Sequence, residues 1–312
     1  MDLVDGVLRS DPLSIARAIS MVEDGAPGLS ELSAGLFPHT GRAWTVGLTG
    51  SPGVGKSTLG GELVRAARAL ERTVAVLAVD PTSPFTGGAL LGDRLRMQTH
   101  ATDPGVFIRS MATRGHLGGM ALAAPEAVRI LDAAGYQVIL VETVGVGQAE
   151  VDVAAATDTT IVVVSPGWGD AIQVAKAGIL EIADVFVVNK ADREGAAAAV
   201  RDLEQMIRMG PTRDWTPPVV TTTAVTGQGM DQLWDAVNAH RAHLETSGGL
   251  ARSRRDRLVR EVESLAVERL RGRVGSLLDG DGALAADLLE RRTDPYAAAA
   301  ILMQRVALAE DP

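Results

Sequence analysis

A glycine-rich stretch near residue 50 leads into a lysine and a serine. The sequence GSPGVGKS at residues 50–57 has the spacing of a phosphate-binding loop, in which backbone N–H groups and a helix N-terminus converge on an anion. Lys56 can reach terminal phosphates, and Ser57 can supply a magnesium ligand. The alternative is a glycine-rich turn with a stray lysine. The residues expected to bind a nucleotide phosphate chain are Gly50, Ser51, Pro52, Gly53, Val54, Gly55, Lys56, Ser57 and Thr58.

A second group of residues follows the apolar run ILVE, which ends on Glu142. An isolated carboxylate at the end of a buried strand is costly to desolvate, so a positive partner is expected there. If this strand runs beside the phosphate-loop strand, Glu142 lies near a magnesium ion held by Ser57, through a water molecule. Gly145 and Gly147 follow directly and can bring backbone N–H groups up to a γ-phosphate. We expect this loop to move when that phosphate leaves.

Two further acids could take part in hydrolysis. Asp80 ends the apolar run at 73–79, and Asp93 follows in the same loop-like segment. Asp80 could position the metal or the attacking water, with Asp93 joining when the segment closes. Alternatively, Asp80 belongs to a turn and Asp93 pairs with a nearby surface arginine. The candidate catalytic residues are Lys56, Asp80 and Asp93, and the candidate magnesium ligands are Ser57, Asp80, Asp93 and Glu142.

A base-recognition motif follows the apolar run VFVVN. In the tetrapeptide Asn189-Lys190-Ala191-Asp192, the Asp192 carboxylate could accept hydrogen bonds from guanine N1 and N2, a pair that adenine does not offer. The stretch TTTAVTGQG at 221–229 supplies a closing loop with Thr223, and the Ala224 backbone could contact the guanine. The tetrapeptide alone occurs often by chance. Its position after a phosphate loop and an acidic strand indicates GTP.

These motifs lie at the ends of strongly apolar, β-branched runs that alternate with helical stretches. That alternation predicts β-α units around a mostly parallel sheet, covered on both faces because the runs are nearly continuously hydrophobic. A helix is expected over residues 56–70. The expected strands are 44–48, 73–79, 106–111, 137–142, 159–164, 185–189 and 218–223.

The two ends of the chain lack strand patterns. After residues 10–12, Ile15, Ile19 and Val22 recur at helical spacing, which predicts a helical segment. The stretch ETSGGLARSRR at 245–255 is typical of a linker, and a helical apolar stripe follows it. The arginines around that stripe are interpreted as a solvated helix face. The expected domains are a helical N-terminal extension (1–42), a nucleotide-binding domain (43–245) and a helical C-terminal arm (246–312).

Composition excludes several classes. The 312-residue chain is 46% hydrophobic and 22% charged, with a net charge of −9, which argues against a surface built to hold nucleic acid or anionic lipid. It has no cysteine, so disulfides, thiolate metal sites and cysteine nucleophiles are excluded. No secretory signal and no apolar run of membrane-spanning length are found, so we expect a cytoplasmic protein without a membrane or nucleic-acid partner.

Four stretches of the chain together resemble the MeaB/ArgK family of GTPase chaperones of adenosylcobalamin-dependent methylmalonyl-CoA mutase. They are GSPGVGKSTL (50–59), VDPTSPFTGGALLGDRLRM (79–97), VETVGVGQAEVDVA (141–154) and GWGDAIQVAKAGILEIADVFVVNKAD (167–192). The resemblance covers about residues 10–275. It implies a P-loop NTPase G domain of the SIMIBI class, with a helical N-terminal extension and a helical C-terminal dimerisation arm. It also implies GTP or GDP with Mg²⁺, a homodimer, and an adenosylcobalamin-dependent acyl-CoA mutase as partner.

The resemblance also carries residue roles. Lys56 and Ser57 match the phosphate loop, and Asn189, Lys190 and Asp192 match the guanine motif. Asp80, Asp93 and Glu142 match acids associated with magnesium and hydrolysis. The family's mobile switch is similar to SPGWGDAIQVAKAG at 165–178, which contains Trp168 and Lys176. One departure is Gln148-Ala149-Glu150, where many relatives have a serine in the middle position.

Three functions are compatible with these motifs. In the first, GTP binding and hydrolysis gate cofactor loading or protect the mutase, with slow turnover because no catalytic glutamine or arginine finger is committed to the site. The second is a nickel-type metallochaperone, which needs soft or imidazole ligands; the five histidines are scattered, and only His240 and His243 have helical spacing. The third is a kinase of a transport-associated protein, for which no dedicated protein-substrate site is found.

Overall fold

The computed structural model describes residues 2–81, 100, 102–113, 119–143, 153–167 and 181–308. At residues 80, 81, 112, 113, 119–122 and 308 only the backbone is described. The chain forms two compact units, Met1–Arg257 and Leu258–Pro312. The first unit contains the sheet, and the described residues of the second form helices and the turns between them. Each unit is described by itself below.

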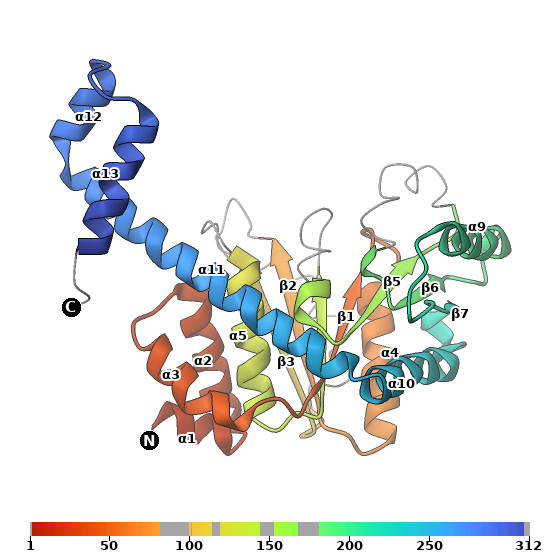
Figure 1. The fold of residues 1–312 in the computed structure, drawn as a ribbon. Helices are drawn as coiled ribbons and strands as arrows, with labels where there is room; N and C mark the ends of the chain where they lie inside the picture. The colour runs from red at the N-terminus through yellow and green to blue at the C-terminus, as the bar shows by residue number, and fades with distance from the viewer. Residues whose placement is uncertain are drawn as a thin grey trace. The chain divides into compact units, whose positions relative to one another are not determined.

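A seven-stranded parallel sheet forms the centre of the first unit, in the order β3-β2-β4-β1-β5-β6-β7. Figure 1 shows the strands running side by side, with β1 in the middle. All seven predicted strands are present. They are β1 (Trp44–Thr49), β2 (Val74–Pro81), β3 (Val106–Thr113), β4 (Val138–Thr143), β5 (Thr159–Val164), β6 (Val185–Asn189) and β7 (Val219–Thr222).

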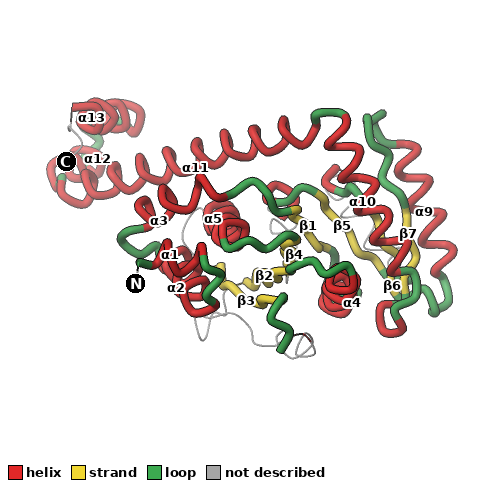
Figure 2. The backbone as a smooth tube through the Cα atoms, turned by 90° about the horizontal axis from the view of Figure 1, so that it is seen from below, coloured by secondary structure: helices red, strands yellow, loops and turns green. Residues whose placement is uncertain are grey.

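Helices cover both faces of this sheet, as the continuous apolar runs predict. Alternate residues of β2 separate the two cores: Leu77 packs with α1–α3 and α5, whereas Val76 packs with α4 and α10. Figure 2 shows α4 and α5 on opposite sides of the sheet. The helices of the first unit are α1 (Leu3–Leu8), α2 (Pro12–Asp24), α3 (Leu29–Leu36), α4 (Lys56–Ala69), α5 (Gly119–Ala133), α9 (Ala196–Met209), α10 (Met230–Thr246) and the start of α11 (Gly249–Gly280).

The predicted N-terminal helix is α2. Its N-cap Asp11 accepts a hydrogen bond from the Ser14 N–H at 2.8 Å, and a proline occupies the first helical turn, both of which favour a helix start. Ile15, Ile19 and Val22 are buried in the same core as strand residues of the sheet. The N-terminal helices therefore pack on the sheet as part of the first unit.

The predicted linker at 245–255 is wrong. Helix α10 continues to Thr246, only residues 247–248 break the helical run, and α11 starts at Gly249. Gly248 turns the chain with φ +67°, a conformation that favours glycine. The interpretation of the arginines as a solvated face also fails at two positions. Arg254 and Arg257 form ion pairs with Asp158, whose side chain is fully buried, and this tertiary contact holds the polar segment as helix.

The second unit has a small core of its own. Leu284, Ala298 and Leu302 are buried between α12 (Gly282–Leu289), α13 (Pro295–Leu308) and the end of α11. Asp281 caps α12 by accepting a hydrogen bond from the Leu284 N–H at 3.0 Å, and it also pairs with Arg305. Among the described residues, no helix in either unit combines the length and apolar character needed to cross a membrane.

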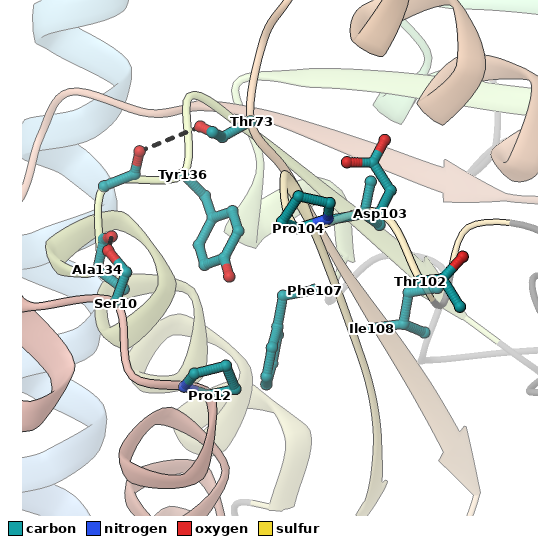
Figure 3. A pocket seen from close by; sticks show the side chains of 12 residues that line it. Ser10, Pro12, Thr73, Thr102, Asp103, Pro104, Phe107, Ile108, Ala134 and Tyr136 are labelled. Carbon is teal, nitrogen blue, oxygen red and sulfur yellow. Dashed lines mark hydrogen bonds between the residues drawn. The ribbon is translucent and has the colours of Figure 1, made fainter.

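A cavity of about 450 Å³ opens at the amino-terminal edge of β2, β3 and β4. Figure 3 shows the Tyr136 and Phe107 side chains lining it. Their ring centroids are 6.0 Å apart. Burial raises the pKa of the Tyr136 hydroxyl. None of the residues that line this cavity belongs to the predicted phosphate or base motifs, which lie at the carboxyl ends of the strands. Cavity size alone therefore does not locate the candidate site.

The amino-terminal edge of β6 carries a half-buried acid beside a buried histidine. Asp184 accepts a hydrogen bond from the Thr160 N–H at 2.8 Å, and its Oδ1 lies 3.4 Å from His240 Nε2. His240 Nδ1 lies 3.0 Å from Thr159 Oγ1. Burial raises the pKa of Asp184 to about 7 and lowers the pKa of His240 to about 4. Between about pH 4 and pH 7, both groups therefore favour their neutral forms in the folded chain.

This environment predicts that Asp184→Asn stabilises the fold more at pH 8 than at pH 5. The Asp184 carboxyl group loses its proton near pH 3.8 in the unfolded chain and near pH 7 in the folded chain. The wild type therefore loses stability as the pH rises from about 4 to about 7. Because the side chain keeps 30% exposure, we expect a change in ΔΔG on the order of 1–2 kcal/mol. Urea denaturation at both pH values measures it. Asp202→Asn, on the exposed side of α9, controls for net charge, and a pH-independent effect of Asp184→Asn would contradict the raised pKa.

Candidate functional site

The glycine-rich loop connects β1 to α4 at the carboxyl edge of the sheet. Gly50 has φ +134°, and a Cβ atom there would lie 2.1 Å from the Val163 carbonyl oxygen, so only glycine allows the loop to pass this close to β5. Gly55 is the N-cap of α4 with φ +100°, and Gly53 has φ +78°. The loop residues thus bend around the N-terminus of α4, where unpaired backbone N–H groups favour an anion.

Lys56 and Ser57 begin α4 and are both buried. Lys56 Nζ donates to the Gly50 carbonyl at 2.6 Å and to the Ser51 carbonyl at 3.1 Å, so the ammonium group lies over the loop. Ser57 Oγ donates to Glu142 Oε1 at 2.7 Å. The predicted residues of the phosphate loop and the predicted acid are therefore together in space.

The pairing of β1 with β4 brings Glu142 to this place. Leu48 lies opposite Glu142 in the parallel ladder, two residues before the loop begins. The prediction that the strand at 137–142 runs beside the phosphate-loop strand is confirmed. Glu142 is only 1% exposed, and its carboxylate faces a hydroxyl group. Hydroxyl and carboxylate oxygens are ligands that suit Mg²⁺, so this pair fits a magnesium ion.

Asn189 ties the base motif to the phosphate loop. Its Nδ2 donates to the Val54 carbonyl at 2.8 Å, while its Oδ1 accepts from Thr222 Oγ1 and from the Ala224 N–H, each at 3.1 Å. Lys190 has φ +60° and donates from Nζ to the Gly53 carbonyl at 2.6 Å. Three segments of the chain are thus joined by two side chains of the motif.

Asp192 and the closing loop complete the described part of the base motif. Asp192 is exposed, three residues beyond Asn189 and at the same edge of the sheet. The Thr223 N–H donates to the Gln228 carbonyl at 3.0 Å, which closes the loop at 223–228. The Ala224 N–H donates to Asn189 Oδ1, and the predicted contact of the Ala224 backbone with guanine remains a prediction. The sequence motif did not predict that the Asn189 side chain bonds to other parts of the protein. The only signal in the sequence was its position at the end of a buried strand.

Several predicted residues lie outside the described part of the chain. Asp93, Gly145, Gly147, Trp168 and Lys176 are among them. The backbone of Asp80 is described and its side chain is not. Because Ala78 pairs with Glu142 across β2 and β4, the Asp80 backbone lies two residues further along, at the same carboxyl edge. The roles predicted for these residues remain predictions.

The fold and the loop geometry define a P-loop nucleotide-binding protein. The chain belongs to the MeaB family: the family described as "Methylmalonyl Co-A mutase-associated GTPase MeaB" matches residues 15–277. It is therefore a MeaB-family GTPase, and the predicted family and fold class are confirmed.

Related proteins match over most of the chain. A putative GTPase of Pyrococcus horikoshii is 45% identical over 98% of this chain and 98% of its own length. GTPase ArgK of Escherichia coli is 38% identical over 79% of this chain and 77% of its own length. The mouse protein "Methylmalonic aciduria type A homolog, mitochondrial" is 34% identical over 81% of this chain and 65% of its own length. The crystal structure of a "LAO/AO transport system kinase" superposes with a TM-score of 0.72 at 26% identity, covering 98% of this chain and 96% of that one.

The contact between the loop and Asn189 predicts that two glycines respond differently to alanine. Both Gly53 and Gly55 have positive φ, so each alanine costs about 1 kcal/mol of backbone strain. Only at Gly55 would the new Cβ meet another group, Asn189 Nδ2 at 2.4 Å; nothing lies within 4 Å at Gly53. We expect Gly55→Ala to destabilise the nucleotide-free chain by roughly 1–3 kcal/mol more than Gly53→Ala. Chemical denaturation measures both, and equal losses would contradict the close approach.

Proposed function

We propose that the chain binds GTP with Mg²⁺ at the carboxyl edge of the sheet. The observation that carries the proposal is the Ser57–Glu142 pair, 2.7 Å apart, beside a glycine loop that Asn189 joins to the base motif. In this proposal Lys56 and the loop N–H groups hold the phosphates, Ser57 and Glu142 hold the metal directly or through water, and Asp192 reads the guanine edge. Asp80, Asp93 and Gly145 keep their predicted roles, with the two acids near the metal and the glycine near the γ-phosphate.

The proposed reaction is hydrolysis of GTP to GDP and phosphate. A bound magnesium ion would neutralise charge that develops on the phosphate oxygens. The chain's own contribution is to position the nucleotide: Lys56 lies over the loop, and the α4 N-terminus adds a positive dipole. The sequence shows no obvious catalytic glutamine or arginine finger for the site. We therefore propose that GTP hydrolysis is slow and that a partner stimulates it.

The proposed biological role is that of a chaperone of an adenosylcobalamin-dependent acyl-CoA mutase. Nucleotide-dependent movement would gate loading of the cofactor and protect or reactivate the enzyme. The family description names methylmalonyl-CoA mutase association, and the mouse relative carries a name linked to methylmalonic aciduria. Methylmalonyl-CoA mutase is therefore the first partner to test.

We also propose the domain plan and the homodimer that the sequence predicts, with an extension at 1–42, a GTPase domain at 43–245 and an arm at 246–312. The second unit supports a dimer because it exposes large apolar side chains, which a second copy would cover. They include Val259, Val262, Leu265, Val267 and Met303.

The base motif predicts that Asp192→Asn abolishes the preference for guanine. In the proposed complex the carboxylate accepts hydrogen bonds from guanine N1 and N2. An amide in its place has only one acceptor oxygen, and its NH₂ group would face an N–H donor of guanine. We expect the ratio of GDP to ADP affinity to fall by about 100-fold or more. Xanthosine diphosphate should gain affinity, because its C2 carbonyl can accept from the new amide. Isothermal titration calorimetry with the three nucleotides measures these affinities.

The matched control for this test is Glu194→Gln, which neutralises an exposed acid two residues further along. It should bind all three nucleotides like the wild type. If Asp192→Asn retains the wild-type preference for GDP over ADP, the assignment of the base motif is wrong.

The partner role predicts that a mutase changes GTP turnover. Mixing the purified chain with methylmalonyl-CoA mutase should raise the GTPase rate severalfold, and adenosylcobalamin occupancy of the mutase, read by absorbance, should depend on whether GTP or GDP is present. Lys56→Ala removes the cation that lies over the phosphate loop and should abolish both effects. GTP hydrolysis that is unaffected by the mutase, with cofactor occupancy equally unaffected, would exclude this partner.

A further inference from the structure

The cavity at the amino-terminal edge of β2, β3 and β4 is lined by four separate segments of the first unit. They are the turn between α1 and α2, with Ser10 and Pro12, then Thr73 before β2, residues between 102 and 108, and residues 134–136 before β4. The side chains of all these lining residues belong to the described part of the chain. The volume of about 450 Å³ lies in the range of known small-molecule sites. A ligand of that size class would therefore fit.

One buried polar group faces this cavity without a partner. Tyr136 is only 8% exposed, and Figure 3 shows its hydroxyl group pointing into the space that Ser10, Pro12 and Phe107 surround. No residue that the structure describes forms a hydrogen bond with this hydroxyl group, and burial alone raises its pKa. A hydroxyl group that is withdrawn from bulk water without a partner costs free energy. A bound molecule that accepts its hydrogen bond would remove that cost.

The other hydroxyl groups of the cavity are already bonded or lie at its rim. Ser10 Oγ donates to the Ala134 carbonyl at 2.6 Å, and Thr73 Oγ1 donates to the Gly135 carbonyl at 3.2 Å. Thr102 is exposed. Among the lining residues, all of which are described, the tyrosine hydroxyl is therefore the only buried side-chain donor that a ligand could use.

The charge that lines the cavity is compensated. Asp103 accepts hydrogen bonds from Arg68 at 2.8 Å and 2.9 Å, one at each carboxylate oxygen, and from the Gly105 N–H at 2.8 Å. The hydrogen bond with Arg68 lowers the pKa of Asp103. An ionised ligand would therefore find no uncompensated counter-charge among the lining residues, whereas a neutral ligand needs none. Most of the remaining wall is apolar: Pro12, Pro104, Val106, Phe107 and Ile108.

We propose that this cavity binds a small, neutral, mainly apolar molecule that carries one hydrogen-bond acceptor. The Tyr136 hydroxyl group donates to that acceptor, and the apolar body packs against Phe107, Pro12 and Ile108. An aromatic body suits the two aromatic side chains of the wall. The cavity contains no residue of the phosphate or base motifs, so the inference goes beyond the proposed function and does not rest on it. Because Ser10 and Pro12 belong to the N-terminal extension, the ligand would bridge the extension and the sheet.

Three probes of similar size test this site: acetophenone, ethylbenzene and benzoate. Acetophenone has an aromatic ring and a carbonyl acceptor, ethylbenzene lacks the acceptor, and benzoate adds a charge. Each is titrated into the full chain without nucleotide, and amide resonances are followed by two-dimensional NMR. Acetophenone should shift the amides of residues 107–108 and 134–136 with a Kd of about 1 mM. Benzoate should bind at least about 10-fold more weakly, because its charge would be buried without a partner.

Tyr136→Phe removes the hydroxyl group and keeps the aromatic ring. We expect it to weaken acetophenone binding by about five- to tenfold, the effect of one hydrogen bond, and to leave ethylbenzene binding unchanged. A purely structural role of Tyr136 would change the affinity for both probes or for neither. The matched control is Tyr296→Phe, since the chain has only two tyrosines and Tyr296 is 89% exposed in the second unit. It should bind all three probes like the wild type.

Several outcomes would overturn this site. They are the absence of saturable shifts at these amides with acetophenone up to about 10 mM, an equal effect of Tyr136→Phe on acetophenone and ethylbenzene, and benzoate binding as tight as that of acetophenone. If Tyr136→Phe does not fold, the wild type still decides. Acetophenone must then bind it at least about fivefold more tightly than ethylbenzene does, and equal affinities reject the hydrogen bond.

Discussion

The parallel pairing of β1 with β4 is the constraint on which the site depends. Its register sets Glu142 opposite Leu48, and the chain turns into the phosphate loop just beyond. A buried carboxylate is costly unless it is compensated. Here it accepts a hydrogen bond from Ser57 at the N-terminus of α4, where the helix dipole is positive. The magnesium proposal and the γ-phosphate proposal both start from this position of Glu142.

Asn189 imposes a second constraint, because one side chain serves three segments. Its amide donates to the phosphate loop and accepts from Thr222 at the end of β7 and from Ala224 of the closing loop. The phosphate end and the base end of the proposed nucleotide are therefore held on one framework. Such a framework limits independent movement of the two ends, which suits the proposed binding of a guanine nucleotide.

The opposite edge of the sheet has a different character. There, burial disfavours the charge on Asp158, but hydrogen-bonded ion pairs with Arg254 and Arg257 hold its pKa below the usual value, whereas burial raises the pKa of Asp184 to about 7. The two acids therefore lose their protons in different pH ranges, because the two arginines at the start of α11 bond directly to Asp158. Arg254 connects the N-terminal extension, the sheet and α11, so these parts of the first unit share one electrostatic contact.

The sequence by itself determined the seven strands, the phosphate loop and the family. Those features depend on local patterns: β-branched runs favour strands, glycine spacing permits a tight loop, and the apolar runs indicate a sheet covered on both faces. The sequence also predicted that Glu142 lies near Ser57, because the carboxyl ends of neighbouring parallel strands lie at one edge of the sheet, where the phosphate loop leads from β1 into α4.

Only the tertiary structure decided the order of the other strands, the hydrogen bonds made by Asn189 and the partners of the arginines on α11. Arg254 and Arg255 look alike in the sequence, but one pairs with a buried acid 96 positions away and the other is exposed. Helical periodicity shows which residues share a face, and it carries no information about what lies opposite that face. The segment predicted as a linker is helical for the same reason: its stabilising partner, Asp158, is distant in the sequence and adjacent in the fold.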